Sequence, residues 1–203
     1  MKTLLTRCWL ATAALTGALA LTAPTALAQV AEEDDRLGET IRTEAEAMMA
    51  LIDAIDAAIE SGDAKISDTV KAKWVNGRAS WKAVVELAAK KSYGPAFKAA
   101  RDARKHTREP IREVLKAKPT GPVTDALRAY VDVQKPRVVA LKRQAQNYPL
   151  TDDAREGWLV GEAMFKDAQK SAKKKRWDTA FREIDDCLRE LDKVVYETYP
   201  SSR

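Results

Sequence analysis

The stretch KKKRWDTAFREIDDCLREL, residues 173–191, joins a run of cations to the start of a long apolar stripe. From Trp177 onward, apolar side chains recur in alternating steps of four and three. Steps of this kind keep side chains on one side of a helix, so the stripe predicts an amphipathic helix with one face in a core. The stripe consists of Trp177, Phe181, Ile184, Leu188, Leu191, Val195 and Thr198.

Similar stripes fill most of the chain after residue 36. They run through residues 41–59, 66–88, 97–114, 123–148 and 154–172. Strand-like alternation is absent from residues 29–203, and Ala, Leu, Glu, Lys and Arg, which favour helices, dominate the composition. The sequence therefore predicts an all-α fold, an antiparallel helical bundle of five to six helices with short connections.

Turn residues mark the ends of these stripes. Gly62 follows the first stripe and suits a left-handed helix end, and the segment 118–122 is the clearest break in the chain. Pro110 and Pro136 fall inside stripes, so each is expected to kink or divide a helix.

The N-terminus has the pattern of a secretory signal peptide. Lys2 and Arg7 precede an apolar run, and Ala26-Leu27-Ala28 supplies the small residues for cleavage after Ala28. The run is shorter than the roughly 20 residues of a membrane-spanning helix. We therefore expect a signal peptide at 1–28 and one helical-bundle domain at 29–203, with a subdivision near 118–122 left open. The expected location is periplasmic or secreted, with no transmembrane segment in the mature chain.

One cysteine, Cys187, remains after that cleavage, which excludes an intramolecular disulfide. Because it falls on an apolar face, we expect a buried thiol, with an intermolecular disulfide as the alternative.

Charge is unevenly distributed. The full chain carries a formal net charge of +5, but residues 29–63 are strongly acidic and residues 64–150 strongly basic. A modest total charge and export from the cytoplasm argue against nucleic acid as a partner. The two segments can instead pair within the bundle or between the subunits of a homo-oligomer.

Two basic clusters are the candidate binding residues. Either can simply be a solvated surface, the first pairing with the acidic N-terminal helix, or can contact an acidic protein or an anionic envelope component such as lipid, lipopolysaccharide or cell-wall polymer. The first forms a face of one predicted helix: Arg101, Arg104, Lys105, Arg108, Arg112 and Lys116. The second lies at a predicted helix junction: Lys173, Lys174, Lys175 and Arg176.

No residue set indicates catalysis, a cofactor or a metal. The lone His106 is surrounded by arginines and lysines, which disfavour a dication, and no nucleophile motif is present. An alternative is a haem- or metal-binding bundle that uses His106, with Met48 or Met164 as a second haem ligand.

Three tryptophans, Trp74, Trp81 and Trp158, lie on the stripes together with Gly77 and Gly161. Core packing is the favoured interpretation, and a tryptophan-lined groove is the other. Glycine within a helix costs about 1 kcal/mol relative to alanine, so each glycine indicates a close approach of a neighbouring helix or an inserted ring.

The last two stripes resemble half of a tetratricopeptide repeat, through Ala168, Trp177, Asp178, Ala180, Cys187 and Leu188. The chain departs from that family at Ser171, where a large aromatic residue is preferred, and no repeat of period 34 appears elsewhere in it, so we interpret the likeness as tight hairpin packing. Leu150-Thr151-Asp152-Asp153-Ala154 is similar to the Leu-Thr-x-x-Gln motif of small periplasmic chaperones, with alanine in place of glutamine. A helix cap at Thr151 explains the same residues.

The sequence thus favours an exported, non-catalytic helical bundle with a binding or structural role. The haem- or metal-binding bundle and a periplasmic chaperone-like protein are the alternatives.

Overall fold

The computed structural model describes residues 35–119 and 121–198, so the predicted signal peptide at 1–28 and its cleavage site lie outside the described residues. In this part of the chain all regular structure is helical, which confirms an all-α bundle, and none of these helices is long and apolar enough to span a membrane. A first helix covers residues 35–60 and is followed by α2 (Asp68–Ala89), α3 (Tyr93–Lys116), α4 (Pro122–Asp132), α5 (Gln134–Asn147), α6 (Asp152–Lys173) and α7 (Trp177–Thr198).

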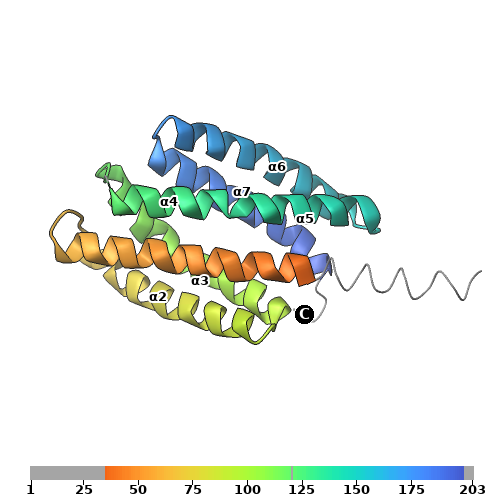
Figure 1. Ribbon diagram of the computed structural model, residues 1–203, viewed down its shortest axis with the longest axis horizontal. Helices are drawn as coiled ribbons and strands as arrows, with labels where there is room; N and C mark the ends of the chain where they lie inside the picture. The colour runs from red at the N-terminus through yellow and green to blue at the C-terminus, as the bar shows by residue number, and fades with distance from the viewer. Residues whose placement is uncertain (1–34, 120, 199–203) are drawn as a thin grey trace, which may run out of the picture. The chain divides into compact units, whose positions relative to one another are not determined.

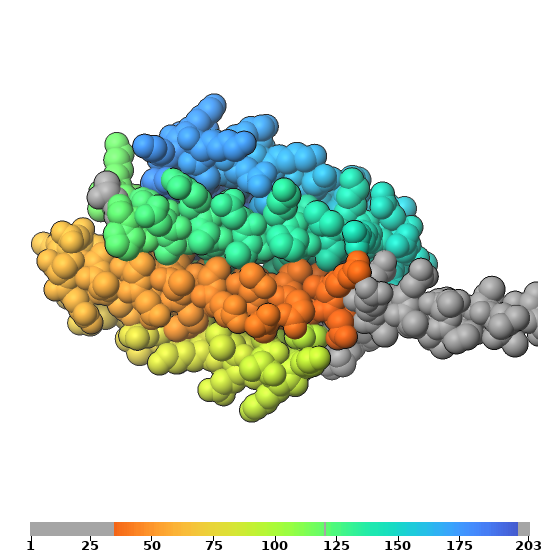
Figure 2. Space-filling view, viewed as in Figure 1, coloured from red at the N-terminus to blue at the C-terminus, as the bar shows by residue number. Residues whose placement is uncertain are grey.

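Two helical hairpins organise the unit formed by residues 37–203. α2 packs along α3, α6 packs along α7, and α3 also packs against α7, which joins the hairpins. On the face shown in Figures 1 and 2, the first helix lies between α2 and the pair α4 and α5. The apolar faces of all these helices therefore meet in one core.

The predicted stripes supply that core. In α2 the buried residues are those of the predicted stripe, namely Val70, Trp74, Gly77, Trp81, Val84 and Ala88. The predicted fourth helix, in contrast, is divided into α4 and α5 around Val133. Pro136 lies in the first turn of α5, where it has no N–H to donate to the preceding turn, and this accounts for the division. Pro110 does not divide its helix, because α3 continues through it.

The stripe glycines mark close helix contacts, as predicted. A Cβ atom at Gly77 would lie 2.5 Å from Cγ2 of Thr107 on α3, and one at Gly161 would lie 2.6 Å from Cδ2 of Leu191 on α7. A side chain larger than hydrogen at either position would therefore require the facing side chain to move or the helices to separate.

The tryptophans pack in or against the core, as the favoured interpretation of the sequence predicted. Trp81 is fully buried and its indole N–H donates to Thr107 Oγ1 at 3.3 Å, while that of Trp74 donates to Asp56 Oδ1 at 2.7 Å. Trp158 is half-buried and packs against the core from α6.

Candidate anion-binding site

A ladder of ion pairs joins the basic face of α3 to α7. Arginines four residues apart on α3 meet aspartates seven residues apart on α7, because the two helices run antiparallel and each spacing returns to the same side of its helix. The pairs are Arg112 with Asp178 (3.3 Å), Arg108 with Asp185 (2.5 Å) and Arg104 with Asp192 (2.7 Å).

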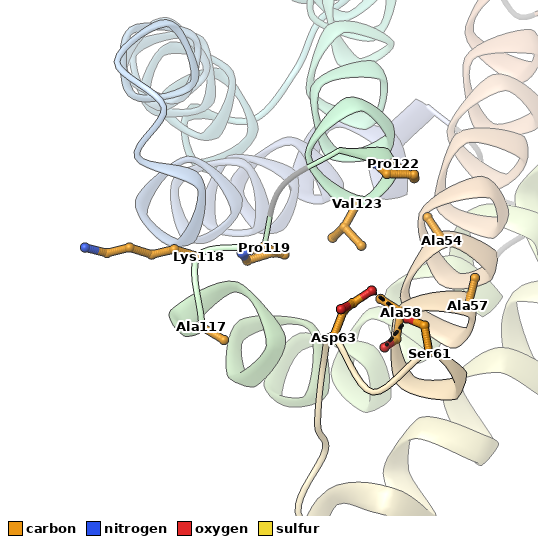
Figure 3. A pocket seen from close by; sticks show the side chains of 10 residues that line it. All are labelled: Ala54, Ala57, Ala58, Ser61, Asp63, Ala117, Lys118, Pro119, Pro122 and Val123. Atoms are coloured by element: carbon orange, nitrogen blue, oxygen red, sulfur yellow. Dashed lines mark hydrogen bonds between the residues drawn. The ribbon is translucent and has the colours of Figure 1, made fainter.

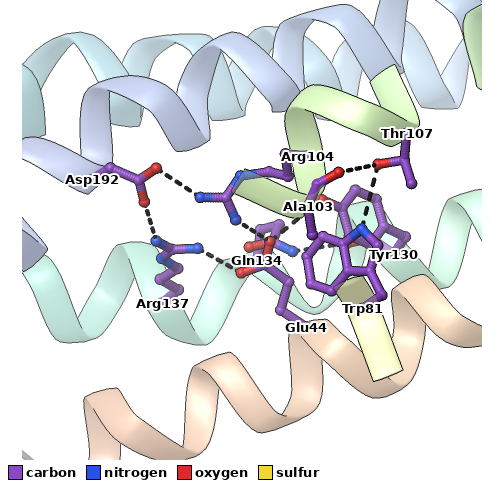
Figure 4. A network of polar contacts seen from close by, with 9 residues as sticks. All are labelled: Glu44, Trp81, Ala103, Arg104, Thr107, Tyr130, Gln134, Arg137 and Asp192. Carbon is purple, nitrogen blue, oxygen red and sulfur yellow. Dashed lines mark hydrogen bonds and ion pairs between the residues drawn. The ribbon is translucent and has the colours of Figure 1, made fainter. Parts of the chain in front are cut away.

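At its buried end the ladder closes into a ring of four charges (Figure 4). Glu44 of the first helix accepts from Arg104 at 2.7 Å and from Arg137 of α5 at 2.6 Å. Asp192 accepts from the same two guanidinium groups at 2.7 and 2.8 Å, and Tyr130 donates a long 3.4 Å bond to Glu44. Each charge of the ring therefore has two opposite neighbours, and four helices are held in register around it.

In Arg104 and Asp185, burial and ion pairing shift the pKa in opposite directions. Burial disfavours the charge of Arg104, but Asp192 and Glu44 outweigh it and raise the pKa of that guanidinium. Burial raises the pKa of Asp185 despite the opposing charge of Arg108, and burial raises the pKa of Tyr130 well above its ordinary value. Arg104 is thus a charged structural group rather than a surface group.

Two other cations of the predicted face, Lys105 and Arg101, also contact neighbouring side chains. Lys105 pairs with Asp102 at 2.8 Å, and the guanidinium of Arg101 lies 4.5 Å from the centre of the Tyr196 ring. A cavity of about 340 Å³ on this face is lined by cations and aspartates together. Among the residues that the structure describes, Arg104 is the one ladder arginine that pairs with the acidic N-terminal helix, and the other two pair with α7.

The second basic cluster forms part of a different cavity, of about 610 Å³, between the end of α3 and the start of α7. Lys175 and Arg176 line it from the α6–α7 turn, and Lys116 and Lys118 line it from the end of α3. Lys173, the last residue of α6, and Lys174, which follows it, are exposed and lie outside this lining. We call Lys116, Lys118, Lys175, Arg176 and the walls between them the cationic cavity.

Within the part of the chain that the structure describes, no carboxylate forms an ion pair with any of the four cations of this cavity. Arg176 makes only a 3.5 Å contact with the hydroxyl of Ser171. Asp178 also lines the cavity, but its carboxylate faces Arg112. It lies in the first turn of α7, which begins at Trp177.

The remaining wall is apolar. Leu115 is almost fully buried, and Pro119 and Trp177 are half-buried beside it. The guanidinium of Arg128 on α4 lies 5.7 Å from the centre of the Trp177 ring, so a cation–π contact helps to fix the indole.

A neighbouring cavity of about 420 Å³ has different chemistry (Figure 3). It is lined mainly by alanines of the first helix, by Val123 and by Asp63, whose carboxylate accepts a 2.7 Å hydrogen bond from Ser61. Lys118 belongs to the lining of this cavity, but its side chain points outward and no other lining residue is cationic, so the cavity does not suit an anion.

The residues named for the haem alternative, His106, Met48 and Met164, lie on three different helices. His106 is half-buried on α3, beside the close contact with Gly77, and Asp102 pairs with Lys105. Met48 is a buried core residue. Over residues 35–119 and 121–198, no group of three or more His, Cys, Asp or Glu side chains is placed to hold a metal ion.

Cys187 lies fully inside the core, as expected from the sequence. Burial raises the pKa of its thiol to about 12, so the nucleophilic thiolate is scarcely populated at neutral pH.

Comparisons with known proteins add no relative. No protein-family model matches the sequence, and no curated protein and no solved structure is similar to it.

Proposed function

We propose that this protein is an exported, non-catalytic helical bundle that binds an anionic lipid surface of the cell envelope through the cationic cavity. The observation that carries this proposal is the convergence of Lys116 and Lys118 with Lys175 and Arg176 around one opening. These residues come from two segments far apart in the sequence, and no carboxylate neutralises them within the described residues.

The cationic cavity suits an anion better than the α3 face does. On that face an incoming anion would compete with Asp185 and Asp192 for arginines that are already paired. At the cationic cavity the positive charges are exposed and near one another, so their potentials add and raise the local concentration of anions. The first turn of α7 adds the positive end of its helix dipole.

A lipid surface fits both the predicted export and the form of the site. Phosphate headgroups attract clustered lysines and arginines by about 1 kcal/mol for each cation close to the surface. Lys116, Lys118, Lys175 and Arg176 are all exposed, so they can approach such a surface together.

Adsorption to vesicles tests the proposal. The full mature chain should adsorb to phosphatidylcholine vesicles that contain phosphatidylglycerol and not to pure phosphatidylcholine vesicles, and added salt should weaken adsorption. The double substitution Lys175→Glu with Arg176→Glu should weaken adsorption about tenfold or more, since four units of charge change at the site.

The matched control is Lys142→Glu with Arg143→Glu, which makes the same charge change at two exposed positions of α5. Adsorption of this control within about twofold of the unsubstituted protein supports a localised site. Equal weakening of both variants would show that only net charge matters, and no adsorption to anionic vesicles would refute the proposed function.

A further inference from the structure

The cationic cavity has two kinds of wall. Lys116, Lys118, Lys175 and Arg176 form a charged rim, whereas Leu115, Pro119 and Trp177 form an apolar wall. Flat adsorption to a charged surface needs only the rim. An apolar wall beside a cationic rim is what a ligand with both an anionic and an apolar part would contact.

The volume of the cationic cavity and the fixed position of its apolar wall support the binding of a single molecule. Cavities that bind small molecules typically span about 300–1,000 Å³, and this one, which is open to solvent on one side, spans about 610 Å³. Arg128 fixes the indole of Trp177 from α4, and Leu115 is anchored in the core, so the apolar wall exists before a ligand arrives.

We infer that the cationic cavity binds one amphiphilic anion at a time, in which a phosphate group is joined to an alkyl chain. The phosphate lies among Lys116, Lys175 and Arg176, where the guanidinium of Arg176 offers a paired N–H fork. The first methylenes of the chain lie on Trp177 and Pro119. This inference rests on the proposed function, because it requires that the cavity meets anions, and it adds the ligand class.

The apolar wall predicts a measurable preference. Each buried methylene contributes about 0.8 kcal/mol of transfer free energy, which is roughly a fourfold gain in affinity. Two or more methylenes against Trp177 and Pro119 should therefore make octyl phosphate bind about tenfold or more tightly than inorganic phosphate. A neutral alkyl ligand of the same chain length should lack the charge contribution.

The experiment titrates the mature protein with monomeric octyl phosphate, inorganic phosphate and octyl glucoside, followed by two-dimensional ¹H–¹⁵N NMR. The indole N–H signal of Trp177, assigned with Trp177→Phe, reports on the apolar wall. Binding of octyl phosphate should shift this signal, and the double variant Lys175→Glu with Arg176→Glu should weaken that binding about tenfold. Lys142→Glu with Arg143→Glu should leave it unchanged.

The three ligands separate the possible modes of binding. Octyl phosphate binding tenfold tighter than phosphate, without comparable octyl glucoside binding, supports the inference. Equal affinity for phosphate and octyl phosphate overturns it but leaves the proposed function standing, and equal affinity for octyl phosphate and octyl glucoside overturns it by showing an apolar groove only. If none of the three binds, the inference fails, and vesicle adsorption then decides whether the proposed function fails with it.

Discussion

Lys118 and Lys175 end two different helices in the same left-handed backbone conformation and line the same cavity. Their φ angles are +53° and +56°. Lys118 follows the end of α3 and Lys175 follows the end of α6, at positions where glycine is commonest because the left-handed region crowds a Cβ atom. The chain thus carries two charged side chains where the backbone alone would favour none.

Replacing either lysine with glycine should separate folding from binding. Lys118→Gly and Lys175→Gly each relieve a left-handed conformation that costs a non-glycine residue roughly 1–2 kcal/mol, partly offset by the greater freedom of glycine in the unfolded chain. We expect urea unfolding to show unchanged or slightly increased stability. Adsorption to anionic vesicles should weaken in both variants, because each removes a cation of the cavity.

Lys91 provides the matched control for this prediction. It has the same conformation, with φ of +54°, at the turn between α2 and α3, and it does not line the cationic cavity. Lys91→Gly should change stability as the other two substitutions do and leave adsorption unchanged. A comparable loss of adsorption in Lys91→Gly would mean that the positions of the two cavity lysines are not special.

The buried ring of charges should dominate the response of the fold to loss of a single carboxylate. Glu44→Gln leaves the guanidinium groups of Arg104 and Arg137 short of a buried countercharge, which typically costs about 3–5 kcal/mol. Glu46→Gln, on the same helix, breaks only an exposed pair with Arg42 and should cost at most about 0.5 kcal/mol. Urea unfolding of both variants measures the difference, and similar stabilities would show that the ring contributes little.

Apolar spacing predicted the core from the sequence, but it could not predict this ring. The stripe of α7 identified Ile184, Leu188 and Leu191 as core residues, and they are fully buried. Asp185 and Asp192 lie beside the same stripe and are buried as well, because arginines on other helices neutralise them. Spacing along one helix carries no information about such partners.

The candidate site was predicted in pieces. Lys116 fell in one basic cluster, and Lys175 and Arg176 fell in another. Their meeting at one cavity, and the presence of Lys118 there, depends on how the end of α3 packs beside the start of α7. The left-handed backbone at Lys118 and Lys175 is a local feature of the site. It could not be predicted from the sequence, because it is visible only in the backbone conformation.

Asp185 should make stability depend on pH in a defined direction. Burial raises its pKa above the ordinary value of 3.8 in spite of Arg108, so the folded state holds the proton more tightly than the unfolded state. The resulting stabilisation is complete below pH 3.8 and is lost as pH rises through the raised pKa. The free energy of unfolding of the unsubstituted protein, minus that of Asp185→Asn, should therefore fall over this range.

Urea unfolding of both proteins across acidic to neutral pH measures that difference, in which the contributions of other groups cancel. Arg108→Gln provides a second check, since removal of the opposing charge should move the loss to higher pH. A difference that rises with pH would instead show that Arg108 lowers the pKa of Asp185 more than burial raises it.

The glycines of α6 give a prediction about which kind of close contact resists change. A Cβ atom at Gly161 would lie 2.6 Å from Cδ2 of Leu191, and one at Gly157 would lie 2.8 Å from the carbonyl oxygen of Glu190. By distance alone, alanine at 161 should be the worse substitution. The obstacle at Gly161 is mainly a leucine side chain that can rotate, however, whereas the obstacle at Gly157 is the backbone of α7, which moves only if the helices separate.

We therefore expect Gly157→Ala to destabilise the protein more than Gly161→Ala, although both gain about 1 kcal/mol of helix propensity. Overpacking of this kind costs typically 1–3 kcal/mol, so Gly157→Ala should show a net loss and Gly161→Ala a smaller one or none. Thermal and urea unfolding of the two variants give the order directly. The reverse order would mean that the side chain of Leu191 is held as rigidly as the backbone, because its neighbours on α6 and α7 leave it no other rotamer.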